Sequence, residues 1–248
     1  MSRIRTPDGI EIASLKGKKT EFFDAMAPGP GTPWEDRGTR GVVSAFLKTC
    51  AMSLTSFFKL VDAIRRPETT NDAFVFLIDC CILWGVSAFI HGLIFMHFAG
   101  KVQYHEVETQ TYLMYVAIAA VGAGGGVYLL FRLYNIIYAK LIAQEKTATA
   151  LPDVLLYNVN AYALGPSILA PIPFIGPALA GLFIFIDLYI AGRKRLNIRA
   201  TGALIDALMA YVVVLVVAFV GYWVGNLVLH QVLGDPIDDV TPKTAQTR

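Results

Sequence analysis

The chain has 248 residues, of which 55% are hydrophobic and 16% are charged, and its formal net charge is +2. The charged residues are unevenly placed, so long stretches offer no polar face to water. This composition excludes an ordinary soluble domain, and the lack of a basic stripe with interleaved aromatic residues argues against nucleic-acid binding. The three cysteines are too few for a secreted disulfide framework. We therefore predict an all-α, multi-pass integral membrane protein.

The amino-terminal region divides into two parts. Residues 1–40 are charged and contain the Gly- and Pro-rich stretch MAPGPGTPWEDRG, which predicts a disordered cytosolic tail. In residues 41–71, apolar residues recur at three- and four-residue steps from Val43 to Val61, and Lys48 and Lys59 fall between them. This pattern predicts an amphipathic cytosolic helix at the membrane interface, with its lysines toward the headgroups. A helix packed on the cytosolic ends of the membrane spans is the open alternative.

Five apolar segments follow and form a predicted membrane domain at 72–233, with a short external tail at 234–248. Segments of this length and apolarity are typical of transmembrane helices, because about 20 helical residues cross the hydrocarbon core. The second segment would be ~48 Å long as one helix and should protrude beyond the bilayer. The expected spans are Ala73–Phe98, Tyr112–Ala143, Pro152–Leu169, Ile172–Gly192 and Ala203–Val232.

The distribution of basic residues predicts the orientation. Of the 21 Lys and Arg residues, 11 lie in residues 1–71, and most of the others lie in alternate loops. Because cytosolic loops carry an excess of Lys and Arg, we expect a cytosolic amino terminus and an external carboxyl terminus. An odd number of spans is required for that arrangement, and five satisfies it.

The stretch AYALGPSILAPIPFIGPALAG joins the third and fourth predicted spans. Pro171 and Pro173 predict an external turn, so the two spans form a tight helix hairpin. Pro166 lies near the outer end of the third span and Pro177 in the first turns of the fourth, while Gly176 lets backbones approach closely. A broken-helix binding site of transporter type is the alternative interpretation.

Ionisable and amide side chains inside the spans fall at a common depth, ~9–12 Å below the cytosolic surface. We expect Arg132 to pair with Asp79 or Asp187, and the asparagines to supply hydrogen bonds between helices. The layer is then either a device that fixes helix register or a site for a lipid headgroup, an ion or a polar solute. Its predicted members are Asp79, Arg132, Asn158, Asn160 and Asp187.

No pattern favours catalysis, and we expect neither an enzyme nor a cofactor. The chain lacks a recognisable Ser-His-Asp arrangement, paired glutamates on a helix and a metal-binding helix motif. A set of external imidazoles and carboxylates lacks the close spacing of a zinc site, so we interpret it as solvated loop residues. These residues are His97, His105, Glu106, Glu108, His230 and Asp235.

Small-residue steps occur in two of the expected spans. Gly122 and Gly126, and likewise Gly221 and Gly225, fit the Gly-x-x-x-Gly pattern that permits close helix crossing. Such faces pack within one subunit or between subunits, so the pattern is compatible with a homo-oligomer or a membrane-protein partner.

The stretch NAYALGPSILAPIPFIGPALAGLFIFIDLYIAG, with the basic loop and apolar segment after it, resembles the Yip family of Ypt/Rab-interacting membrane proteins. Upstream, PWEDRGTRGVVSAFLKTCAMSLTSFFK is similar to the segment that precedes the spans in prokaryotic members. The resemblance implies five spans and a cytosolic amino terminus. For the eukaryotic branch it implies binding of prenylated small GTPases in vesicle traffic. This chain lacks a long Pro/Gln-rich tail, which favours the prokaryotic branch and an inner membrane.

These observations predict a non-catalytic membrane scaffold or adaptor that recruits partners or organises lipid. The basic loop RKRLNIR can hold anionic lipid, although a topology signal alone explains it equally well. A small permease or channel that uses Asp79, Arg132 and Asp187 is the alternative function. The residues expected to contact lipid or a partner are Lys48, Lys59, Arg193, Lys194, Arg195 and Arg199.

Overall fold

The computed structural model describes residues 28–65, 69–99, 109–144, 153–194, 200–205, 207–209, 211–212 and 215–216. These residues form helices and turns, with no strand among them, which confirms the all-α prediction for this part of the chain. Three helices are long and apolar enough to cross a membrane, namely Asn71–Ile94, Val116–Lys140 and Gly176–Arg193. Shorter apolar helices cover Val154–Leu169 and Ala200–Met209.

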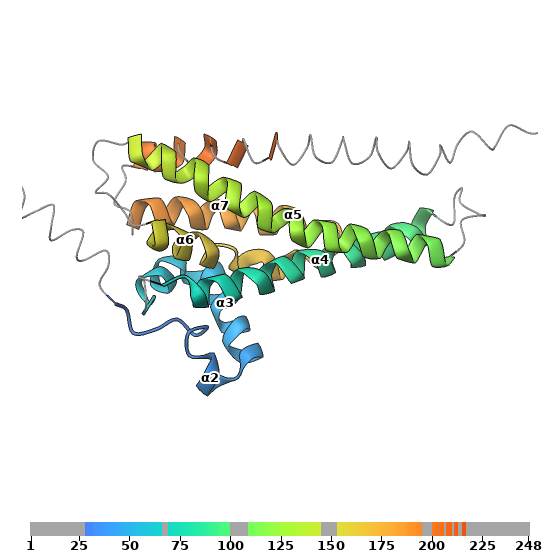
Figure 1. Cartoon of the computed structure of the whole chain (residues 1–248), viewed down its shortest axis with the longest axis horizontal. Helices are drawn as coiled ribbons and strands as arrows, with labels where there is room; N and C mark the ends of the chain where they lie inside the picture. Colours follow the sequence, from blue (N-terminus) through green and yellow to red (C-terminus); the bar gives the residue numbers. More distant parts are fainter. Residues whose placement is uncertain are drawn as a thin grey trace, which may run out of the picture.

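The elements in chain order are α2 (Arg37–Arg40), α3 (Val42–Asp62), α4 (Asn71–Ala99), α5 (Thr109–Gln144), α6 (Asp153–Tyr162), the 3-10 helix η1 (Gly165–Leu169) and α7 (Gly176–Lys194). Helices α4 and α5 form a long pair that runs the length of the bundle (Figure 1). Helices α6, η1 and α7 lie along one half of this pair, and α2 and α3 are at the same end (Figure 1). The described core is therefore concentrated in that half.

Glycines bring the backbones of α4 and α5 close together. A Cβ atom added at Gly124 would lie 2.9 Å from the carbonyl oxygen of Cys81, and one at Gly85 would lie 3.0 Å from that of Ala120. Such contacts leave no room for larger side chains. The predicted Gly-x-x-x-Gly face of α5 is a different one. A Cβ at Gly122 or Gly126 would meet nothing within 4 Å among the described residues.

The third expected span is not one straight helix. Helix α6 ends at Tyr162, and η1 follows after a two-residue turn. Pro166 has no N–H for the carbonyl oxygen of Tyr162, and the hydroxyl oxygen of Ser53 on α3 lies 3.3 Å from that oxygen. A Cβ at Gly165 would lie 2.5 Å from the Ser53 Cβ. The break therefore lies where α3 passes against this segment.

The prediction of a disordered tail is wrong for residues 28–40. Trp34 is only 1% exposed, and its ring lies edge-on to those of Phe46 and Phe76, with centroids 6.0 and 5.8 Å away. Its indole N–H donates to the carbonyl oxygen of Asp72 at 2.8 Å. One large buried aromatic side chain thus anchors a segment that is otherwise charged and rich in Pro and Gly. Residues 1–27 lie outside the described part.

Helix α3 covers the residues where we expected an amphipathic helix, and its backbone leaves helical geometry at Ser56. Its expected apolar face is divided in the structure. Cys50 and Phe57 are buried in the core, whereas Val43 is 72% exposed and Leu47 is also exposed. The helix packs against α6, η1 and α7, which is the contact that the alternative interpretation requires.

Candidate functional site

Of the predicted intramembrane polar residues, Asp187 of α7 lies where α3 meets the bundle. Its carboxylate accepts a 2.6 Å hydrogen bond from the hydroxyl of Ser53, and the aspartate residue is 2% exposed. The same hydroxyl lies 3.3 Å from the Tyr162 carbonyl oxygen. Ser53 thus connects α3 to both members of the α6–α7 hairpin. A buried carboxylate requires such a partner, because burial without one carries a large desolvation penalty.

The two predicted asparagines on α6 connect it to neighbouring segments. The side-chain amide of Asn158 donates to the carbonyl oxygen of Thr69 at 2.7 Å, just before α4. The side-chain amide of Asn160 donates to the Asn135 side-chain oxygen on α5 at 2.9 Å. The Asn135 side-chain amide in turn donates to the Phe131 carbonyl oxygen at 2.9 Å. Of the two bonds, that of Asn160 joins two helices, as we expected, whereas that of Asn158 joins α6 to a residue before α4.

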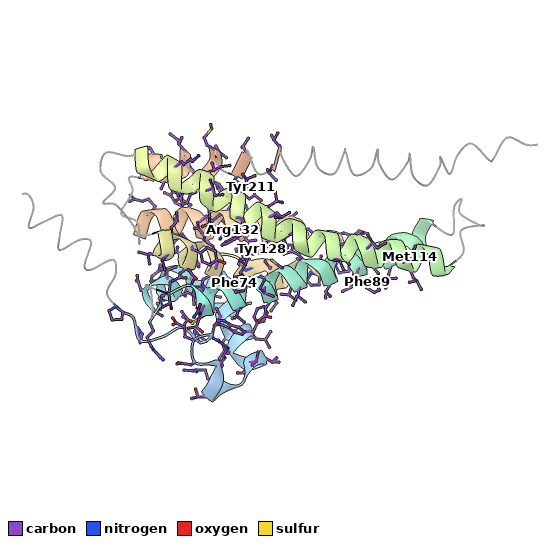
Figure 2. The ribbon with its side chains drawn as sticks, viewed as in Figure 1. Phe74, Phe89, Met114, Tyr128, Arg132 and Tyr211 are labelled. Carbon is purple, nitrogen blue, oxygen red and sulfur yellow. The ribbon has the colours of Figure 1, made fainter. Side chains whose placement is uncertain are left out.

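Arg132 does not form the ion pair that we expected. Its side chain is exposed on α5, one turn from Tyr128 (Figure 2). The ion pairs seen among the described residues join Arg37 to Asp72 at the start of α4, and Arg40 and Arg65 to Asp36. Asp187 is instead occupied by Ser53, and Asp79 is half-buried on α4. The sequence could indicate a shared depth for these groups, but their direction around each helix depends on packing.

Sequence reasoning missed a polar network just before α2. The Thr32 backbone N–H donates to the Glu35 carboxylate at 2.6 Å, and the Glu35 N–H donates to the Thr32 hydroxyl at 3.2 Å. This reciprocal pair is a capping box, and its signal is present in the letters TPWE. The Thr32 hydroxyl also contacts that of Tyr162 at 3.3 Å, so the network reaches α6.

Two arginines attach this network to the rest of the chain. Arg37 donates to the Asp72 carboxylate at 2.6 Å and lies over the Trp34 ring, 5.0 Å from its centroid. Arg65 donates to the Asp36 carboxylate at 2.8 Å and to the Pro30 carbonyl oxygen at 2.6 Å. A cavity of about 280 Å³ lies beside these groups, lined by Glu35, Arg37, Gly38, Arg65 and Asp72. The two cationic side chains that line this cavity, Arg37 and Arg65, are already paired with carboxylates.

The predicted helix hairpin is a tight turn at residues 170–175 between η1 and α7. A Cβ at Gly176 would lie 2.3 Å from the Leu169 carbonyl oxygen, so only glycine fits there. Ser87 on α4 donates to the Ala170 carbonyl oxygen at 2.7 Å. Helix α4 extends about 18 Å further, from Ser87 to its end at Ala99. Phe174, in a left-handed conformation, is 76% exposed. Of the predicted hairpin prolines, Pro166 is buried, Pro171 is half-buried and Pro173 is exposed. Pro177 lies in the first turn of α7.

The residues predicted to contact lipid or a partner divide between two places. Lys48 and Lys59 are exposed on α3, and Arg193 is exposed near the end of α7, which Lys194 completes. Other predicted residues lie outside the described residues or have side chains that are not described. These are Arg195 and Arg199 of the basic loop, and His97, His105, Glu106, Glu108, His230 and Asp235 of the external set.

Comparison of the chain with protein-family models, with curated proteins and with solved structures finds no significant match.

Proposed function

We propose that the chain is a non-catalytic membrane scaffold or adaptor that presents a fixed surface on α2 and α3 to partners or lipid. The observation that carries this proposal is the attachment of residues 28–65 to the bundle by buried polar and aromatic contacts. Ser53 bonds to Asp187 at 2.6 Å, and Trp34 bonds to Asp72 at 2.8 Å. The intramembrane polar groups thus hold a non-spanning segment in one position.

The exposed part of α3 supports a place at the membrane interface. Val43, Leu47 and Phe58 expose apolar surface, while Lys48 and Lys59 add positive charge beside them. Apolar and basic side chains on one short helix suit the boundary between acyl chains and anionic headgroups. We propose that α3 lies in the cytosolic leaflet, with its buried face packed against the bundle.

The proposed topology has five spans and a cytosolic amino terminus. It adds the α6–η1 segment and the apolar residues from 203 to 232 to the three helices that are long enough to span. The charge distribution supports it, because basic residues concentrate before α4 and in alternate loops. We also propose a Yip-type membrane domain of the prokaryotic branch in an inner membrane. The resemblance of residues 160–192 supports this assignment, and a small-GTPase partner follows only if the eukaryotic role applies.

Co-purification from native membranes tests the adaptor function. The tagged full-length chain is crosslinked in its own membranes, and bound proteins are quantified by mass spectrometry. We expect one membrane protein in near-stoichiometric amount, lost in the V43S/L47S double variant. The matched control is I118S/V121S, which makes the same kind of change on exposed α5 residues. Equal recovery with both double variants, or with an unrelated multi-pass protein as bait, would contradict the proposal.

The permease alternative has one observation in its favour. The Asn160 side-chain oxygen is buried without a partner among the described residues, in the segment where the helix breaks. Broken helices with polar groups at depth are a feature of transporter sites. Purified protein in sealed liposomes should move neither ions nor small polar solutes if the adaptor function is correct. Flux that disappears in the Asn160→Leu variant would favour the permease instead.

A further inference from the structure

A second, larger groove lies between the amino-terminal segment and one side of α3. Its volume is about 620 Å³. The residues that line it are Pro30, Gly31, Pro33, Arg40, Lys48, Ala51, Met52, Thr55, Lys59 and Ala63. Three of these side chains are basic and none is acidic, so the groove carries concentrated positive charge.

The two cavities differ in how their cations are matched. In the smaller one, Arg37 and Arg65 each bond to an aspartate at 2.8 Å or less. In the larger groove, Arg40 reaches Asp36 only at 3.7 Å, and the Lys59 ammonium lies over the Phe58 ring, 5.9 Å from its centroid. The ion pairs of the described residues do not include Lys48. The larger groove therefore has charge available for an anion.

The walls between these cations are apolar. Pro30, Pro33, Ala51 and Met52 offer carbon surface, and the Thr55 hydroxyl already donates to the Ala51 carbonyl oxygen at 2.7 Å. A fitting ligand thus combines a negative group with an apolar part. The exposed apolar surface of Val43 and Leu47 lies on the same helix, which is where the acyl chains of such a ligand would run.

Backbone contacts hold the groove open before any ligand binds. The Gly29 N–H donates to the Ile64 carbonyl oxygen and the Gly31 N–H to that of Ala63, each at 2.8 Å. Gly31 has a φ of 112°, and a Cβ at Gly29 would lie 2.4 Å from the Asp62 carbonyl oxygen. The amino-terminal wall is therefore fixed against the end of α3, and a preformed site loses little ordering entropy on binding.

We propose that this groove binds the phosphate headgroup of an anionic glycerophospholipid from the leaflet in which α3 lies. Lys48, Lys59 and Arg40 contact the phosphate, and the apolar wall contacts the glycerol and the upper acyl chains. The inference deepens the proposed function, because it names the lipid class that the α3 surface selects.

The test uses the purified full-length chain in a neutral detergent. Its melting temperature is measured with increasing short-chain phosphatidylglycerol, with short-chain phosphatidylcholine and with inorganic phosphate. We expect phosphatidylglycerol alone to raise the melting temperature, and native mass spectrometry to show one lipid bound at the lowest concentrations. The effect should weaken as salt is added, because the lysines are exposed. An equal shift with phosphatidylcholine, or with inorganic phosphate at the same concentration, would overturn the proposal.

Three variants locate the effect in the groove. K48Q/K59Q should weaken phosphatidylglycerol binding by about tenfold or more, since each cation near an anionic lipid contributes appreciably. Ala51→Trp fills the groove without changing its charge and should also abolish binding. Lys140→Gln removes an exposed cation of α5 outside the groove and should bind as wild type does. Unchanged binding by both groove variants would refute the site. Because no partner protein is present, this result is independent of the co-purification that tests the adaptor function.

Discussion

Ser53 on α3 and Asp187 on α7 are 134 residues apart in the chain and 2.6 Å apart in the structure. This contact joins a helix outside the three candidate spans to the interior of the bundle. It gives the Asp187 carboxylate a partner and places the Ser53 hydroxyl beside the carbonyl oxygen that Pro166 leaves without an N–H. One serine thereby lies against both the buried aspartate and the break in the helix.

Removing this hydroxyl should loosen α3. We expect Ser53→Ala to lower the free energy of unfolding by about 1–3 kcal/mol, the range for leaving a buried polar group without its partner. Thermal unfolding of the purified protein in detergent measures the change. Ser44→Ala, on the same helix but only half-buried, is the matched control and should change stability far less. Similar losses for both variants would mean that the Asp187 contact contributes little.

Trp34 should control whether residues 28–40 stay attached. Its replacement by Ala removes a fully buried aromatic side chain, which typically lowers stability by about 3–5 kcal/mol. We expect Trp34→Ala to make the segment sensitive to protease in inverted membrane vesicles, which expose the cytosolic face. Trp34→Phe retains the ring packing and loses the hydrogen bond to Asp72, so it should be protected almost as well as wild type. Protection of the Ala variant would place the anchor elsewhere.

Two glycines of α5 should respond in opposite directions to the same change. Gly124→Ala forces a Cβ against the Cys81 carbonyl oxygen and should destabilise the α4–α5 pair. Gly122→Ala meets nothing within 4 Å in the described part and should be neutral or stabilising by up to about 1 kcal/mol, because Ala favours helix. Unfolding in detergent compares the two. If Gly122→Ala instead lowers the yield of a crosslinked dimer, the predicted Gly-x-x-x-Gly face packs between subunits.

Arg132 should be less important for stability than its position inside a span suggests. Its side chain is exposed and is absent from the ion pairs of the described residues. Arg132→Ala and Lys140→Ala should therefore have similarly small effects on thermal unfolding, within about 0.5 kcal/mol. The ion pair expected from the sequence predicted a much larger loss for Arg132. A selective loss on Arg132→Ala would restore that pairing.

The Cys50 thiol should be unreactive while the protein is folded. Burial disfavours its thiolate and raises its pKa from 9.0 to about 12. In a C80A/C81A background, we expect negligible labelling by maleimide at pH 8 and rapid labelling after unfolding. Since the folded pKa is the higher one, the stability linked to this proton is present below pH 9.0 and declines as pH rises toward about 12. Rapid labelling of the folded protein would show that α3 separates from the bundle.

Much of the fold was predictable because its signals are local. The lengths of the apolar runs predicted α4, α5 and α7, and the prolines and glycines between 165 and 177 predicted a hairpin turn. The three- to four-residue periodicity predicted a helix where α3 occurs. Each of these features depends on residues that are close together in the chain, so the amino-acid sequence alone can indicate them.

Pairings between distant residues were decided only by the tertiary structure. The position of Asp187 along its expected span predicted its depth but could not show that Ser53, rather than Arg132, would reach it. The capping letters TPWE were readable, yet only the tertiary structure shows that the rings of Phe46 and Phe76 enclose Trp34 and that Asp72 accepts from its indole N–H. Likewise, the letters show Pro166 after Tyr162, but only the structure shows that α3 passes too closely for a side chain at Gly165. Such outcomes depend on which faces of separate helices meet, and that choice minimises buried unpaired polar groups and empty volume over the whole bundle.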